Sequence, residues 1–149
     1  MLATNFKATV FTNQAAFEVM RSSGGRIINL GSSEGVFGNP IAAAYSANKA
    51  AVQAWTRSAA KAWGYCGVTV NEVAPAVETR GAQRLREFLG PEGGTILDQQ
   101  LQAVIPLGGR LGDPLRDLAS LLVFLAGEGS RFITGQLLAI DGGVMMLSG

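Results

Sequence analysis

Tyr45 and Lys49 are two residues of types that can exchange a proton, and they stand four positions apart. On a helix, this spacing places both side chains on one face, one turn apart. A free phenol loses its proton at about pH 10, and a neighbouring ammonium group stabilises the phenolate form. The pair could therefore act as a general acid and base. Taken alone, it is equally consistent with an ordinary exposed lysine on a helix.

Other candidates for proton transfer are limited because the sequence contains no histidine. This absence excludes the Ser–His–Asp and Cys–His nucleophile systems and argues against a zinc site. Ser32 precedes Tyr45 by 13 positions and directly follows a short apolar stretch. Its hydroxyl can hydrogen-bond a carbonyl or alkoxide oxygen and stabilise charge that develops there. The alternative for Ser32 is a turn-forming role in a loop rich in Ser and Gly.

The elements that must position these residues follow from the hydrophobic pattern and its stop signals. Strands are predicted over residues 26–30, 68–73 and 136–140, and helices over residues 5–21, 43–63 and 113–126. The alanine-rich pattern supports the central helix, and Asp113-Pro114 is a typical start for the last one. Residues 31–40 are expected to form a loop. Residues 76–112 are expected to be irregular, apart from a helical piece at 97–104.

The alternation of helices and strands predicts an α/β fold with parallel strands, right-handed crossovers and helices on both faces. In such sheets, ligands bind at the carboxyl ends of the strands. Ser32 and Pro75 each stand just after a predicted strand, so we expect a site at that edge. No internal repeat or linker divides the 149 residues, and one domain is expected.

The composition indicates a globular α/β protein, with 48% hydrophobic and 15% charged residues. The formal net charge of +1 gives no reason to expect nucleic acid or an acidic membrane as a partner. The apolar run at residues 118–126 is too short for a membrane span, which needs about 20 residues. Cys66 is the single cysteine, so no intrachain disulfide can form, and we expect a reducing, cytoplasmic location.

The sequence around these residues resembles the short-chain dehydrogenase/reductase family, of the 3-oxoacyl-carrier-protein reductase kind. Asn5 stands in a run similar to the family's N-x-x-G/A element, 27 positions before Ser32. The other matching runs are residues 25–33, 45–51, 70–75, 132–136 and 140–143. The matches cover almost the whole chain, in the family's order.

The resemblance implies an NAD(P)-dependent oxidoreductase that interconverts a secondary alcohol and a ketone by hydride transfer. Tyr45 would be the general acid in reduction and the general base in oxidation. Lys49 would bind the ribose hydroxyls of the nicotinamide nucleotide and stabilise the phenolate. Ser32 would orient the substrate oxygen, and Asn5 would hold a water molecule in the proton relay.

The resemblance also implies a cofactor site at the nicotinamide, formed by Tyr45, Lys49, Pro75, Ala76, Val77 and Thr79. Thr79 would contact the carboxamide, and Val77 or its neighbour would offer backbone groups to it. Two features depart from the family pattern, because Ala76 replaces the usual glycine and Thr79 comes one position early. Alanine costs little there provided that its φ is negative.

One family element is missing from this sequence. The N-terminal half of the family carries a T-G-x-x-x-G-x-G turn, which places the pyrophosphate at a helix N-terminus. Gly31, Gly35 and Gly38 imitate it, but the second spacing is wrong and Phe37 fills a glycine position. We interpret residues 1–149 as a single partial domain, the C-terminal part of a doubly wound, mostly parallel Rossmann-like sheet. About 100 residues of roughly 250 would be absent, in a fragment or a truncated product.

Two functions are compatible with this interpretation. The first is the oxidoreductase, with a small-molecule carbonyl or alcohol as substrate and either NAD or NADP as cofactor. The second is a truncated, inactive family member that serves only as an assembly partner. The resemblance implies a homo-oligomer, a dimer or a homotetramer, formed through the two long helices and the last helix and strand. We expect no cofactor binding by the isolated chain, and tight binding would contradict the second function.

Substrate choice is expected to depend on residues 78–106, which would form the substrate lid by resemblance. This segment mixes arginines with apolar side chains, and such segments commonly carry specificity. Acyl thioesters, sugars, steroids and cyclic diols all remain open.

Overall fold

Three short segments rich in β-branched and apolar residues form a sheet. The computed structural model of the chain describes residues 2–146, and within them the strands lie in the order β1-β2-β3. Their bounds are Gly25–Leu30 for β1, Val68–Pro75 for β2 and Leu137–Ile140 for β3. β1 and β2 pair in parallel along their length. The prediction of three strands in a parallel sheet is confirmed.

The predicted helices are present, with changes at their ends. The helical elements are η1 Ala3–Lys7, α1 Ala8–Met20, α2 Glu34–Phe37, α3 Ala43–Trp63, η2 Gly64–Cys66, α4 Arg80–Val104, η3 Pro114–Leu118, α5 Ala119–Ala126 and η4 Glu128–Ser130. The π-helical turns η1 and η3 lead into α1 and α5. Asp113 begins η3 as an N-cap, because its carboxylate accepts hydrogen bonds from the backbone N–H groups of Leu115 and Arg116, both at 2.8 Å.

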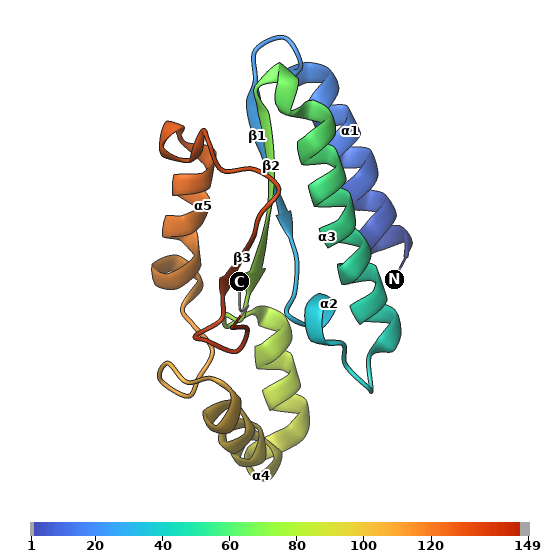
Figure 1. Cartoon of the computed structure of the whole chain (residues 1–149). Helices are drawn as coiled ribbons and strands as arrows, with labels where there is room; N and C mark the ends of the chain where they lie inside the picture. Colours follow the sequence, from blue (N-terminus) through green and yellow to red (C-terminus); the bar gives the residue numbers. More distant parts are fainter. Residues whose placement is uncertain (1, 147–149) are drawn as a thin grey trace. The chain divides into compact units, whose positions relative to one another are not determined.

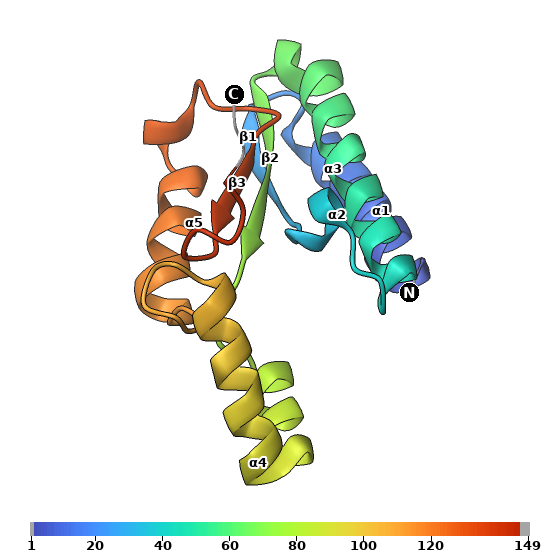
Figure 2. The same cartoon turned by 60° about the horizontal axis from the view of Figure 1, so that its bottom comes forward.

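The loop expected at residues 31–40 contains a helix, so that prediction was wrong. In the segment at residues 76–112, the helical piece expected at 97–104 is confirmed, whereas the expectation that the rest is irregular was wrong. The short helix α2 interrupts the loop at residues 31–40, and α4 occupies most of residues 76–112. Gly90 divides α4 into two arms because its φ of 67° and ψ of −174° lie outside the helical region, and Pro91 follows it. Figure 2 shows the two arms folded back on one another, and Arg86 forms an ion pair with Asp98 between them. The glycines and the proline interrupt the helical sequence pattern of two arms that are each short.

The described residues form two compact units. The first consists of residues 2–74 and 122–138, and the second of residues 75–121 and 139–146. The interpretation of residues 1–149 as a single partial domain therefore stays a prediction. None of the helices formed by residues 2–146 is both long and apolar enough to cross a lipid bilayer.

In the first unit, α1 and α3 cover one face of β1 and β2 (Figure 1). The buried core between helices and strands consists of Ile27, Ala59, Ala60, Val68 and Val70. Aromatic rings pack against this core from the helix side, where Phe17 and Trp63 stack with their centroids 4.6 Å apart. Burial of this apolar surface holds α3, and with it Tyr45 and Lys49, against the sheet.

The opposite face of β2 is covered by residues 122–138. Asn71 donates a hydrogen bond to the carbonyl of Ile133 at 2.8 Å and accepts one from the backbone N–H of Gln136 at 3.1 Å. Since neighbouring residues of a strand point to opposite faces, Asn71 faces away from the core that contains Val70. Helical segments therefore flank both faces of the sheet, as a doubly wound fold requires.

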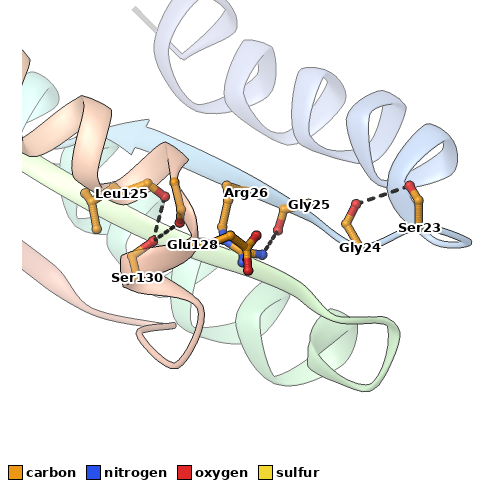
Figure 3. A network of polar contacts seen from close by, with 8 residues as sticks. Ser23, Gly24, Gly25, Arg26, Leu125, Glu128 and Ser130 are labelled. Carbon is orange, nitrogen blue, oxygen red and sulfur yellow. Dashed lines mark hydrogen bonds and ion pairs between the residues drawn. The ribbon is translucent and has the colours of Figure 1, made fainter.

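An ion pair joins residues 122–138 to β1, next to polar contacts internal to each segment (Figure 3). Arg26 of β1 pairs with Glu128, with 3.3 Å between Nη2 and Oε1. The Ser130 hydroxyl donates to the carbonyl of Leu125 at 2.8 Å, which closes the end of α5. Ser130 is fully buried, so this bond satisfies a hydroxyl that water cannot reach.

Candidate active site

Helix α3 presents Tyr45 and Lys49 on one face, as their spacing predicts. The ammonium nitrogen of Lys49 lies 5.6 Å from the centroid of the Tyr45 ring. It also donates a hydrogen bond of 2.8 Å to the carbonyl of Leu30, the last residue of β1. Lys49 is therefore fixed between the end of a strand and the phenol, whereas a solvated helix lysine would have no such anchor.

The loop that carries Ser32 packs closely on α3. The Ser32 hydroxyl oxygen accepts a hydrogen bond of 3.2 Å from the backbone N–H of Glu34 at the start of α2. α2 contacts α3, and Gly35 makes the approach possible. A Cβ atom at position 35 would lie 2.9 Å from the backbone nitrogen of Ala50 and 3.0 Å from Cβ of Lys49. Gly35 thus holds the Ser32 loop close to Lys49.

Asn5 lies in the π-helical turn η1, which also packs against α3. Its side chain is half-buried, and its backbone carbonyl accepts a hydrogen bond of 2.8 Å from the Thr9 hydroxyl. The four residues expected to transfer the proton therefore lie in the first unit, on α3 or on elements that contact it. Their catalytic roles remain predictions.

A buried amide pair connects α1, β1 and α3 on the same face of the sheet. The side chains of Asn13 and Asn29 exchange two hydrogen bonds, of 2.9 and 3.0 Å. Asn29 also donates to the Thr56 hydroxyl at 2.9 Å, and the Trp55 indole donates to Asn13 at 3.0 Å. A buried amide without partners costs about 1–3 kcal/mol. The network therefore favours one arrangement of the three elements that carry the site.

Glu72 is a buried carboxylate that the sequence analysis did not identify. It stands opposite Asn29 in the β1–β2 pairing, and its exposed fraction is 1%. Burial raises the pKa of Glu72 to about 7, against the opposing effects of the Lys49 and Arg57 charges. Burial likewise lowers the pKa of Lys49, and the negative charge of Glu72 opposes that change. The charged form of each of these two side chains thus stabilises the charged form of the other.

The residues expected at the nicotinamide lie in the second unit, or at its border in the case of Pro75. Val77 forms an isolated parallel bridge with Gly112. In that bridge the N–H of Gly112 donates to the carbonyl of Ala76 at 3.0 Å, and the N–H of Glu78 donates to the carbonyl of Gly112 at 2.8 Å. A parallel bridge of this kind uses the backbone groups on either side of Val77 and leaves those of Val77 itself outside it.

Ala76 fits its position without strain, since no residue other than glycine has a positive φ within residues 2–146. Its backbone N–H donates to the carbonyl of Ile140 at 2.8 Å, and the residue borders a hollow formed within the second unit. Thr79 is the N-cap of α4, and its hydroxyl oxygen accepts a hydrogen bond of 3.1 Å from the N–H of Ala82. The Thr79 hydroxyl proton remains available for a further acceptor.

Comparison with known proteins identifies the family. Residues 1–145 match the family model described as enoyl-(acyl carrier protein) reductase. The chain belongs to the short-chain dehydrogenase/reductase family. Among curated members, the (3R)-3-hydroxyacyl-CoA dehydrogenase of Rattus norvegicus is 37% identical over an alignment of 149 positions that covers 98% of this chain and 54% of that protein. The 3-oxoacyl-[acyl-carrier-protein] reductase FabG of Vibrio cholerae is 38% identical over an alignment of 149 positions that covers 99% of this chain and 57% of that protein.

Solved structures of short-chain dehydrogenases/reductases have the same fold. The structure of ElxO with NADP bound superposes with a TM-score of 0.81 at 33% identity and covers 94% of this chain and 54% of that one. A variant of ElxO with NADPH bound gives a TM-score of 0.83, also at 33% identity, and covers 97% and 56%. This chain therefore spans about half the length of the relatives that it matches.

Proposed function

We propose that the protein to which this chain belongs is an NAD(P)-dependent oxidoreductase that interconverts a secondary alcohol and a ketone. The observation that carries the proposal is the fixed position of Lys49, 5.6 Å from the Tyr45 ring and hydrogen-bonded to the end of β1. Membership of the short-chain dehydrogenase/reductase family supports it. The names of two relatives, a hydroxyacyl-CoA dehydrogenase and an oxoacyl reductase, describe the two directions of this chemistry.

In this mechanism, Tyr45 transfers the proton. In reduction, its phenol donates the proton to the substrate oxygen, and in oxidation its phenolate removes the proton from the hydroxyl. The ammonium of Lys49 stabilises the phenolate, because an opposite charge nearby favours the charged form. Ser32 orients the substrate oxygen, and Asn5 holds a water molecule that connects the phenol to solvent. NAD(P), when bound, supplies or accepts the hydride.

The residues present suit the nicotinamide end of such a cofactor. An ammonium has three N–H donors, and within residues 2–146 Lys49 uses one of them on the Leu30 carbonyl. Two donors remain for the hydroxyls of a ribose. In the second unit, Val77 has backbone groups outside its bridge, Thr79 has a hydroxyl proton to donate, and Pro75 and Ala76 are partly exposed. ElxO with NADP bound supports the choice of cofactor class.

The substrate is proposed to be a small carbonyl or alcohol, and an acyl thioester is the class that the relatives' names favour. A homo-oligomer, dimer or homotetramer, and a cytoplasmic location are further parts of the proposal. Cys66 carries a free thiol, which suits a reducing compartment.

The direct test follows nicotinamide absorbance with the protein that contains this chain. NADPH and NADH would each be supplied with a 3-oxoacyl thioester, and NADP and NAD with a 3-hydroxyacyl thioester. We expect consumption of the reduced cofactor with the ketone and its formation with the alcohol. If neither changes, and sugar, steroid and cyclic diol substrates also give no reaction, the oxidoreductase is excluded and the inactive assembly partner is favoured.

A further inference from the structure

Glu72 occupies a position where an apolar residue would be expected. Its neighbours on the same face of β2 are Val70 and Ala74, which have exposed fractions of 0% and 1%. Among residues 2–146, its Oε2 atom has no hydrogen-bond partner. A buried, incompletely paired carboxylate is costly. Its presence between two apolar residues therefore points to a role other than packing.

The carboxylate of Glu72 lies against the peptide group that anchors Lys49. A Cβ atom on Gly31 would lie 2.0 Å from Oε1 of Glu72, so the carboxylate occupies the space that a side chain at position 31 would need. The carbonyl of the Leu30–Gly31 peptide accepts the hydrogen bond from Lys49 at 2.8 Å. The N–H of the same peptide donates to the carbonyl of Val73 at 2.8 Å. This one peptide therefore connects the carboxylate, the ammonium and both strands.

Within residues 2–146, the charged groups that act on Glu72 are Lys49 and Arg57, both on α3. The other described elements next to it contribute uncharged groups. β1 places the amide of Asn29 opposite Glu72, and the segment leading into β3 contributes the backbone carbonyl of Gln136, which accepts from the N–H of Glu72 at 2.8 Å. The field at Lys49 therefore depends on whether Glu72 is ionised.

We propose that Glu72 is a positioning residue for Lys49, whose carboxylate keeps the ammonium charged and directed at the Leu30–Gly31 peptide. The inference rests on the proposed function in so far as Lys49 acts with Tyr45. Ionised Glu72 offsets the cost of burying the Lys49 charge, whereas protonated Glu72 leaves that charge without a counterion on the sheet side. Glu72 thereby sets the pH range in which Lys49 supports the phenolate.

The test is an NMR titration of the chain labelled with ¹³C at the lysine Cε atoms. The sequence has three lysines, and Lys7→Arg and Lys61→Arg variants assign the Lys49 signal. We expect the Lys49 signal to shift with a midpoint at about pH 7, where Glu72 ionises, before its own titration at higher pH. A Lys49 signal without this first step overturns the proposal, and this result needs no substitution at position 72.

Substitutions at Glu72 separate its charge from its packing. In Glu72→Gln, which keeps the shape and removes the charge, we expect the step at about pH 7 to vanish and the pKa of Lys49 to fall. Glu72→Asp should restore a step, and Glu18→Gln, which removes an exposed carboxylate from α1, should leave the Lys49 titration unchanged. An unchanged Lys49 titration in a folded Glu72→Gln variant overturns the proposal.

The titration distinguishes a failure of this inference from a failure of the proposed function. It reads the Lys49 side chain directly and requires neither cofactor nor turnover. A Lys49 signal that is insensitive to Glu72 overturns the positioning role while hydride transfer remains possible. Absence of nicotinamide turnover overturns the oxidoreductase while the coupling of the two side chains stands.

Discussion

The buried carboxylate of Glu72 should make the chain less stable as the pH rises through neutrality. Its pKa is about 7 in the folded chain, against 4.5 for an ordinary exposed carboxyl. Between these two pH values the folded state retains a proton that the unfolded state has lost, so the free energy of unfolding falls with rising pH. The contribution of Glu72 to the free energy of unfolding is fully present below pH 4.5 and is progressively lost as the pH rises to about 7. The difference corresponds to about 3 kcal/mol, taken as an upper figure.

Replacing Glu72 with glutamine should remove this pH dependence. We expect Glu72→Gln to be close to wild type at about pH 5 and more stable by up to about 3 kcal/mol at about pH 8.5. Urea unfolding followed by tryptophan fluorescence measures this, because Trp55 and Trp63 both pack at the core of the first unit. The sequence contains no histidine, the side chain that ordinarily titrates in this range.

A carboxylate at the surface provides the matched control. Glu18 pairs with Arg21 on α1 and is well exposed, so Glu18→Gln should keep the wild-type dependence on pH. A parallel loss of stability in Glu72→Gln and wild type between about pH 5 and 8.5 would refute the raised pKa of Glu72. That result would mean that the pKa of Glu72 is the same in the folded chain as in the unfolded chain.

Three further substitutions test the packing around the site and the start of α5. Gly31→Ala places a Cβ atom 2.0 Å from Oε1 of Glu72 and should cost about 1–3 kcal/mol in urea unfolding; in a Glu72→Ala background the cost should largely disappear, and strict additivity would contradict the contact. Asn13→Ala removes the donor to the buried side-chain oxygen of Asn29 and should cost about 2 kcal/mol by the same assay, whereas a change within about 0.5 kcal/mol would show that the network contributes little. Asp113→Ala removes the acceptor of two backbone N–H groups and should lower the midpoint of thermal unfolding, an expectation that an unchanged midpoint would disprove.

The parts of the fold that the sequence predicts are those with a clear period and a clear end. The helix at residues 43–63 has an alanine-rich pattern closed by glycine, and it is found with the predicted bounds. Only the last part of α4, residues 97–104, was predicted, because Gly90, Pro91, Gly93 and Gly94 interrupt the pattern before it. Those residues mark the junction of two short arms, and Thr79 supplies the cap that begins the first. Glycine and proline residues thus interrupt the sequence pattern of two helical arms, although the N-cap and the contact between the arms stabilise them.

In the candidate site, too, the sequence predicts some residues and not others. The spacing of Tyr45 and Lys49 and the position of Ser32 after a strand are local features, so the sequence reveals them. Glu72 could not be identified, because every residue from 68 to 74 of β2 is buried and no alternation shows which face each one occupies. In the sequence, Gly35 stands out only as one of three glycines whose spacing is similar to that of a phosphate-binding turn. Its role depends on the distance to α3, which no local pattern encodes.

Proton transfer by Tyr45 can be tested directly, because the two tyrosines of the chain allow a matched comparison. Tyr45→Phe and Tyr65→Phe each remove one hydroxyl, and Tyr65 is exposed at the surface with an exposed fraction of 84%. In the protein that contains this chain, we expect Tyr45→Phe to reduce turnover by at least about 100-fold while cofactor binding stays nearly intact. Tyr65→Phe should leave both unchanged. Turnover by Tyr45→Phe at the rate of Tyr65→Phe would contradict the mechanism.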